Sequence, residues 1–196
     1  MNKKYELLPK GENGLHQVKS LRDLGDVKVG ELGGYIEKES NLSHEGNAWV
    51  SGNARVYGDA RVYGNAWVFD NAWVSGNARV FGNAWVYGNA WVFDNARVSG
   101  NARVFGNAWV SGDARVFGNA QVTKCLYFQQ FKHSITVTDT HVFIGCEGHS
   151  WAYWKANITQ IGEEHEYTPD EIRQVANLLN ILHLQINGKL LTETPK

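Results

Sequence analysis

The sequence predicts a mainly β protein built around a parallel β-helix, with a β cap before it and a small α+β domain after it. Three observations predict this fold. Residues 46–123 read as thirteen consecutive hexads of the form Gly-Asn-Ala-x-Val-z, without insertion or deletion. Eleven of the 21 glycines and none of the three prolines lie in that range. The composition changes abruptly after Thr123, where the hexads end.

The hexads predict short strands joined by sharp corners. A helix is excluded because a glycine at every sixth position costs about 1 kcal/mol relative to alanine. In an extended segment Ala and Val point to one side and x to the other, while Gly and Asn tolerate the positive φ of a corner. Three hexads then form one triangular coil of 18 residues, and coils stack about 4.8 Å apart. Thirteen hexads give roughly four and a third coils, with Ala and Val filling the interior.

The hexads resemble the left-handed parallel β-helix of the hexapeptide-repeat superfamily, best known from acyltransferases, and the handedness we expect comes from this resemblance. Three further segments, residues 15–23 (LHQVKSLRD), 30–36 (GELGGYI) and 41–50 (NLSHEGNAWV), are similar to β-helix proteins of phages, prophages and enterobacteria. Those proteins are usually labelled as transferases from their repeats alone. The resemblance covers roughly residues 15–123 and implies a fold and a phage or bacterial origin, without a chemistry.

We expect residues 1–45 to form an N-terminal cap. Apolar residues are scattered through this segment, and Gly30 and the Gly33–Gly34 pair are turn signals. An open coil end exposes unpaired strand edges that have to be covered. A small β-rich cap fits both observations.

Residues 124–196 are expected to form the C-terminal α+β domain. Residues 125–131, 135–138 and 141–145 are rich in aromatic and β-branched side chains, which predicts short strands. Apolar residues at helical spacing from Trp151 to Ile161 follow Ser150, a candidate N-cap. Thr168-Pro169-Asp170-Glu171 is a capping box, and it opens a helix with an apolar stripe that ends at Asn187-Gly188.

Stacking at 18 residues sorts the outward x positions into three faces. One face carries the unbroken series that we call the arginine ladder: Arg61, Arg79, Arg97 and Arg115. A second carries Arg55 followed by the tryptophan stack: Trp73, Trp91 and Trp109. The third carries Trp49, Trp67, Trp85, Arg103 and Gln121. So much aromatic surface on a solenoid favours a partner, and we predict that the tryptophan stack is the interface of a homo-oligomer, a dimer or a trimer.

The arginine ladder, together with Trp67 and Trp85, is the predicted ligand-binding site. Guanidinium groups about 4.8 Å apart repel one another, and the repeat holds only four Asp against six Arg. Bound phosphates or acidic partner side chains would neutralise them, and Trp planes suit the stacking of nucleobases. The alternative is a solvated charged face that keeps an apolar rod in solution. Duplex nucleic acid is disfavoured by the formal net charge of -1.

The sequence offers little for catalysis or metal binding. Hexapeptide acyltransferases use a histidine base, yet no histidine lies between 46 and 123, and only His44 and His133 flank the array. Cys146-x-x-His149 is half of a zinc-site spacing, which Cys125 or His141 could complete. We predict no catalytic residue, no metal and no cofactor.

The remaining sequence features concern the cellular compartment of the protein. The two cysteines are too few for a disulfide scaffold, the basic N-terminus is followed by no apolar run, and no stretch approaches 18 apolar residues. We therefore expect a protein of the bacterial host cytoplasm without a membrane partner. The leading hypothesis is a non-enzymatic phage-type protein that sequesters a nucleotide-like host signal or blocks a host defence protein. A structural or assembly protein is the alternative, and an acyl-CoA-dependent acyltransferase is third.

Overall fold

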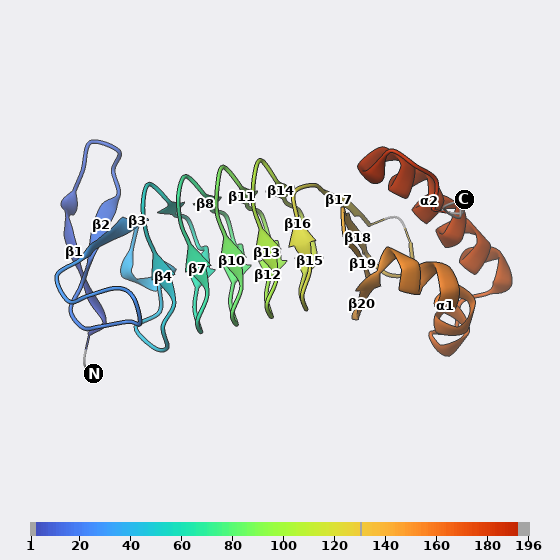
Figure 1. Cartoon of the computed structure of the whole chain (residues 1–196), viewed down its shortest axis with the longest axis horizontal. Helices are drawn as coiled ribbons and strands as arrows, with labels where there is room; N and C mark the ends of the chain where they lie inside the picture. Colours follow the sequence, from blue (N-terminus) through green and yellow to red (C-terminus); the bar gives the residue numbers. More distant parts are fainter. Residues whose placement is uncertain (1–2, 130, 192–196) are drawn as a thin grey trace.

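The computed structural model describes residues 3–129 and 131–191. Figure 1 shows an elongated molecule in which an N-terminal cap, a solenoid, a small sheet and two helices follow one another along the long axis. The predicted mainly β fold, a parallel β-solenoid followed by a small domain with a sheet and two helices, is confirmed.

Each hexad forms one two-residue strand made of its x and Val residues, and the strands stack in three parallel sheets. The first sheet contains β4 (Trp49–Val50), β7 (Trp67–Val68), β10 (Trp85–Val86), β13 (Arg103–Val104) and β16 (Gln121–Val122). The second contains β5 (Arg55–Val56), β8 (Trp73–Val74), β11 (Trp91–Val92) and β14 (Trp109–Val110). The third contains β6 (Arg61–Val62), β9 (Arg79–Val80), β12 (Arg97–Val98) and β15 (Arg115–Val116).

The interior of the solenoid is made of the Ala and Val of the hexads. None of these residues is more than 1% exposed. Partners in neighbouring coils are equivalent residues, as in the pairing of Arg97 with Arg79 and Arg115. The predicted division of the x positions into three faces is therefore correct.

The corners between the strands hold the coils in register. The glycine of each corner has a positive φ, for example 71° at Gly88. Asp70 and Asp94 take the glycine position with a φ of 59°. Their carboxylates accept the N–H of Gly88 (3.2 Å) and Gly112 (3.0 Å) in the next coil, which offsets the strain of a left-handed non-glycine residue. Asparagines 18 residues apart also donate to one another, as Asn77 does to Asn95 (3.0 Å).

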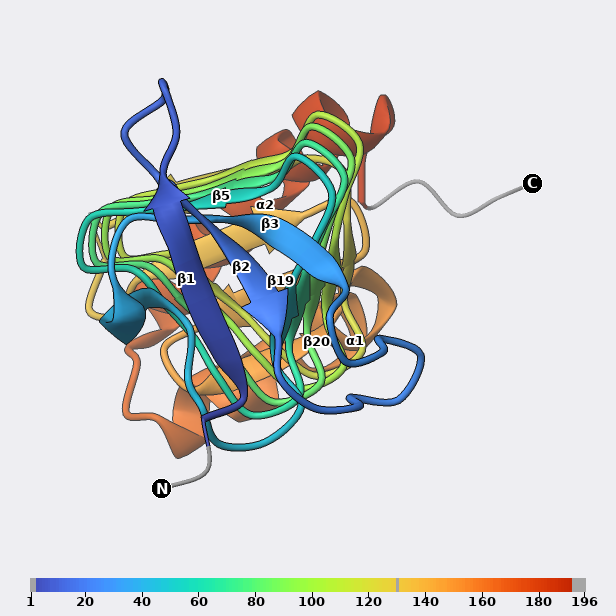
Figure 2. The ribbon, with the colours of Figure 1, turned by 90° about the vertical axis from the view of Figure 1, so that its left-hand side faces the viewer.

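Three antiparallel strands cap the N-terminal end: β1 (Tyr5–Lys10), β2 (His16–Ser20) and β3 (Leu32–Ile36), followed by the short 3₁₀ helix η1 (Glu39–Asn41). Figure 2 shows β1 and β2 lying across the end of the coils. β3 also pairs in parallel with β5, so parallel stacking starts before the first hexad. Gly33 allows β3 to lie close to β4 as well, because a Cβ there would lie 2.5 Å from the Val50 carbonyl oxygen. The cap buries Trp49 completely.

The C-terminal domain begins with a four-stranded antiparallel sheet and ends with two helices. The strands are β17 (Cys125–Phe128), β18 (Ile135–Thr138), β19 (His141–Ile144) and β20 (Glu147–Ser150). The helices are α1 (Trp151–Glu164) and α2 (Pro169–Asn187). Phe143 joins the solenoid core, whereas Val142 and Ile144 on the other face of the sheet pack against the helices. In the part of the chain that the structure describes, no helix is long and apolar enough to cross a membrane.

The caps of both helices follow the prediction. The Ser150 hydroxyl accepts the N–H of Tyr153 (3.3 Å). Thr168 and Glu171 form the capping box, and Gly188 ends α2 with a φ of 73°. The strand β20 is an addition to the prediction, because its sequence Glu-Gly-His-Ser has low β propensity.

The C-terminal domain caps the last coil. Its side chains accept the backbone hydrogen bonds that the backbone of a further coil would otherwise accept. The bonds run from Arg115 N to Thr136 Oγ1 (3.1 Å), from Gln121 N to Thr140 Oγ1 (3.2 Å) and from Thr123 N to the Asp139 carboxylate (3.0 Å). Strand N–H groups that would otherwise be unpaired are thus satisfied at this end.

We predict that Gly100→Ala destabilises the protein more than Gly106→Ala does. Both glycines have a φ near 67°, 68° at Gly100 and 66° at Gly106, so both alanines carry the same left-handed strain of about 1–2 kcal/mol. A Cβ at Gly100 would also lie 2.8 Å from Gly118 N, whereas nothing lies within 4 Å of one at Gly106. Urea denaturation of both variants measures the difference. Gly100→Asp should recover part of the loss, because its carboxylate can accept the Gly118 N–H. Equal losses at both positions would contradict the role given to the close approach of the coils.

Candidate anion-binding site

The arginine ladder lies on the third sheet, on β6, β9, β12 and β15, with all four side chains exposed. Neighbouring strands of a sheet are about 4.8 Å apart, which sets the spacing of the arginine Cα atoms. Within residues 3–129 and 131–191 these side chains form no ion pair, hydrogen bond or ring contact. The ladder is therefore a row of four positive charges that the described chain does not neutralise by direct contact.

The other two arginines of the repeat occupy the same x position but have a partner. The Arg55 guanidinium carbon lies 5.0 Å from the centroid of the Trp73 ring, and that of Arg103 lies 5.0 Å from Trp85. Such contacts are typical cation–π geometry. The absence of a contact partner thus distinguishes the ladder from the other arginines of the same repeat.

A groove of about 780 Å³ lies between the C-terminal part of the ladder and the C-terminal domain, and we call it the C-terminal groove. Arg79, Arg97 and Arg115 line one side. The opposite side contains residues from the end of β17 to the turn after β19: Tyr127, Gln129, Phe131, Lys132, His133, Ser134, Gly145 and Cys146. Positive charge, aromatic rings and polar groups therefore face one open space.

The charges of this groove do not balance. Asp113 is the carboxylate among its lining residues, and it accepts a hydrogen bond from the Tyr127 hydroxyl (3.4 Å). Burial, aided by Asp113, raises the pKa of Tyr127, so the phenol remains protonated. The Lys132 ammonium donates to the carbonyls of His165 (3.1 Å) and Glu166 (3.2 Å) just beyond α1. Three guanidinium groups consequently face a single carboxylate.

A second groove, of about 480 Å³, lies at the other end of the ladder, and we call it the N-terminal groove. Arg61, Arg79 and Tyr63 line it together with His44 and Glu39 of the cap. Hydrogen bonds from Lys3 and His44 lower the pKa of Glu39, so its carboxylate is ionised and already paired. Arg79 lines both grooves.

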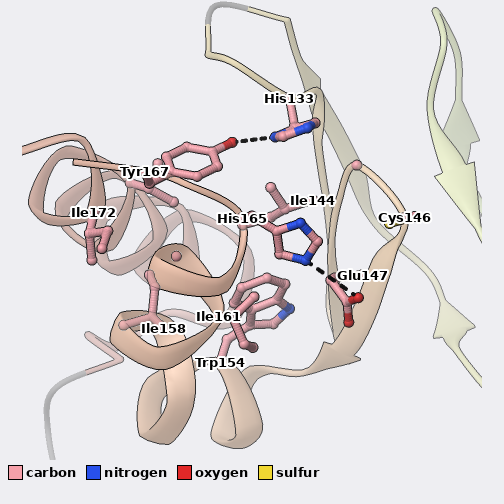
Figure 3. A pocket seen from close by; sticks show the side chains of 13 residues that line it. His133, Ile144, Cys146, Glu147, Trp154, Ile158, Ile161, His165, Tyr167 and Ile172 are labelled. Carbon is pink, nitrogen blue, oxygen red and sulfur yellow. Dashed lines mark hydrogen bonds and ion pairs between the residues drawn. The ribbon is translucent and has the colours of Figure 1, made fainter. Parts of the chain in front are cut away.

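A small apolar cavity of about 50 Å³ adjoins the C-terminal groove, and Figure 3 shows it between the turn after β19 and the two helices. Its polar rim includes His133, whose Nδ1 lies 2.7 Å from the Tyr167 hydroxyl. Glu147 lies between two histidines, 2.8 Å from His149 Nε2 and 3.7 Å from His165 Nε2. The cavity is far smaller than the roughly 150 Å³ that hold a benzene molecule. It is therefore no site for a nucleobase.

The half zinc site suggested by the spacing of Cys146 and His149 is not completed in the described residues. There, no group of three or more His, Cys, Asp or Glu side chains is arranged to hold a metal ion. Cys125 lies instead against the solenoid core, where burial raises the pKa of its thiol to about 12.

The predicted ligand-binding residues fall into two separate groups. The four arginines of the ladder share one sheet, but Trp67 and Trp85 lie on the first sheet and line neither groove. Within one chain, therefore, tryptophan and ladder arginine do not meet in one pocket. The tryptophan stack is continuous, with ring centroids 4.7 Å apart between Trp73 and Trp91 and 5.3 Å apart between Trp91 and Trp109. Trp109, at its end, is 58% exposed.

Sequence reasoning missed the side of the C-terminal groove that the last domain contributes. Tyr127, Phe131 and Ser134 carry no pattern that connects them with the hexads. Only the docking of the C-terminal sheet on the last coil brings them opposite the ladder. The remaining signal in the sequence was the abrupt end of the repeat at Thr123.

The comparisons with known proteins agree with the architecture. Five stretches of the chain match the family described as YdcK beta solenoid repeat: residues 48–62, 54–70, 60–76 and 72–88, which overlap, and residues 96–112. All five lie within the hexads. No curated protein matches the chain in sequence. The comparisons thus support a β-solenoid repeat protein.

We predict that iodoacetamide modifies Cys146 in the native protein and leaves Cys125 intact. Cys146 is exposed in the C-terminal groove, whereas the Cys125 thiol, with its pKa of about 12, supplies almost no thiolate near pH 8. The rates should differ by more than about a hundredfold, because the thiolate is the reactive form. Mass spectrometry of tryptic peptides measures both sites, and Cys146→Ser provides the control without a fast site. Equal labelling would contradict the packing of β17 on the last coil.

Proposed function

We propose that the chain is a non-enzymatic binding protein that holds a phosphate-bearing, nucleotide-like molecule against the arginine ladder. The observation that carries the proposal is the row of four arginines on consecutive strands, paired in register, whose side chains have no contact partner in the described chain. Arginine binds phosphate oxygens with two parallel hydrogen bonds, and such charge-assisted bonds are roughly twice as strong as neutral ones.

The size and lining of the C-terminal groove support a ligand of nucleotide size. Binding pockets for small molecules commonly have volumes of 300–1,000 Å³, and this groove measures about 780 Å³. Tyr127 and Phe131 supply aromatic side chains beside Arg97 and Arg115. Aromatic side chains beside cationic groups are the combination that binds nucleobases and phosphates together.

Binding is favoured over catalysis because the histidines of the grooves already have structural partners. His44 accepts the Lys4 N–H through Nδ1 (3.2 Å) and stacks on Tyr5, with ring centroids 4.2 Å apart. His133 is hydrogen bonded to Tyr167. A general base needs access to the proton that it removes. An acyltransferase therefore remains the third hypothesis.

The resemblance to phage and prophage β-helix proteins supports a biological role within this proposal. Such a protein would act in the cytoplasm of the bacterial host, where it would sequester a nucleotide-like signal or block a host defence protein. The ladder suits the first of these roles directly. The net charge of -1 still disfavours duplex nucleic acid as the ligand.

We predict that Arg79→Gln with Arg97→Gln abolishes stabilisation by the ligand. A thermal-shift screen of linear and cyclic nucleotides, ADP-ribose and acetyl-CoA identifies a ligand for the wild type. At a hundred times its dissociation constant, such a ligand stabilises the fold by about 2.7 kcal/mol, or roughly 5–10 °C at this chain length. Loss of two charge-assisted contacts, each worth about 1.5–3 kcal/mol, lowers the affinity at least a hundredfold.

The matched control is Arg55→Gln with Arg103→Gln, which removes two arginines from the same hexad position on the other two faces. It should keep the full thermal shift. The ladder variant without ligand should melt no lower than the wild type, because the substitutions relieve repulsion. A panel in which no anion stabilises the wild type, or an unchanged shift in the ladder variant, would refute the proposal.

A structural or assembly role is the second candidate, and it rests on the exposed end of the tryptophan stack. Trp109 is 58% exposed and continues a row of stacked rings from Trp73. Large exposed aromatic surfaces favour contact with another protein. A second copy of the chain would cover the row with the same surface in a two-fold dimer.

We predict that Trp109→Glu yields a smaller species than the wild type in light scattering. The substitution places a charge at the most exposed ring of the stack and leaves Trp73 and Trp91 in place. Trp85→Glu is the control, since Trp85 is 40% exposed but lies on the first sheet. An identical mass for wild type and Trp109→Glu would exclude this surface as the interface.

A further inference from the structure

We infer that the two grooves are the ends of one trough, and that its ligand is a short linear polyanion whose phosphates follow the arginine ladder. The inference deepens the proposed function and rests on it. It names the class of ligand: a molecule with several phosphates in a row, in place of a compact one with a single phosphate.

The ladder runs through both grooves without interruption. Arg61 lines the N-terminal groove, Arg97 and Arg115 line the C-terminal groove, and Arg79 lines both. The four strands that carry these arginines are consecutive in one sheet and pair in register. At about 4.8 Å per strand, the first and last Cα atoms of the ladder are about 14 Å apart.

Each end of the trough is closed by another part of the chain. At the N-terminal end, Leu42 bridges Val62, which places Glu39 and His44 beside Arg61. At the C-terminal end, Thr136 caps Arg115, and the C-terminal sheet continues beyond it. Glu39 and Asp113 add one carboxylate near each end. The trough is thus closed by protein at each end, and these ends limit the length of the ligand.

A single phosphate leaves part of the ladder unmatched. One phosphate can contact two neighbouring guanidinium groups, so the other two would keep their mutual repulsion. A row of phosphates along the trough pairs with all four. Inorganic polyphosphate and a short single-stranded oligonucleotide both have such a row.

The test is a length series of probes with the full chain. The inorganic arm uses phosphate, pyrophosphate, tripolyphosphate and longer polyphosphates. The second arm uses oligouridylates of two to eight nucleotides, and isothermal calorimetry measures both. We expect the affinity to rise with each phosphate until the trough is full and then to level off. A tighter inorganic or oligonucleotide arm at equal phosphate number identifies the source of the phosphates.

Single variants distinguish the trough from an isolated groove. Arg97→Gln should weaken every probe, whereas Arg61→Gln should weaken at least fivefold only those probes long enough to reach the N-terminal groove. The salt dependence of the oligonucleotide affinity should decrease by about 0.7 in its logarithmic slope for each arginine removed. Arg103→Gln, at the same hexad position on the first sheet, is the control and should change neither quantity.

Three results would overturn the inference. If Arg61→Gln has no effect at any length while Arg97→Gln weakens binding, the ligand occupies the C-terminal groove alone, and the proposed function stands. If the affinity per molecule keeps rising with probes far longer than the trough, its ends do not limit the ligand. If no phosphate probe binds, the proposed function fails together with the inference.

Discussion

The close approach of one glycine corner to the next is the constraint on which the rest of the structure depends. At Gly76 a Cβ would lie 2.9 Å from the Asp94 backbone nitrogen, and the φ of 65° is itself suited to glycine. Because the corners of successive coils lie directly above one another, the two-residue strands between them have no freedom of register. Every x residue therefore lies above the x residue 18 positions earlier. The charge rows and ring stacks on the surface follow from a backbone requirement inside the corner.

The same requirement explains which parts of the structure the sequence predicts and which it does not. The period alone predicts the interior and the three faces, because a strict repeat leaves one register. It does not predict exposure: Trp49 and Trp85 occupy equivalent positions on one sheet, yet the cap buries the first and leaves the second 40% exposed. Nor does it predict the C-terminal groove, since Tyr127 and His133 reach the ladder only through the docking of a domain outside the repeat. The strand β20 escaped prediction because tertiary pairing overrides the poor β propensity of its residues.

The solenoid presents its unmatched charges on a rigid support. The strand residues of the ladder are fixed by backbone hydrogen bonds on both sides, as in the bond from Arg97 N to Ala114 O (2.9 Å). The arginine side chains themselves are long and exposed, so binding of the proposed ligand would have to order only those side chains. A preorganised backbone lowers the entropic cost of binding. The fold withstands the repulsion among the guanidinium groups, because the geometry of the corners keeps the coils in register independently of the x side chains on their surface.

The side-chain cap at the end of the last coil makes the length of the solenoid adjustable. Thr136, Thr140 and Asp139 bind backbone N–H groups of the coil, and Asp139 also accepts a hydrogen bond from the Thr123 hydroxyl (2.7 Å). A coil with the same backbone and a hydroxyl at the position of Thr123 could therefore serve as the last one. A gain or loss of 18 residues would move the C-terminal domain by the spacing of one coil, about 4.8 Å. It would also add or remove one strand of the sheet that carries the arginine ladder. The number of coils therefore sets the length of the arginine ladder.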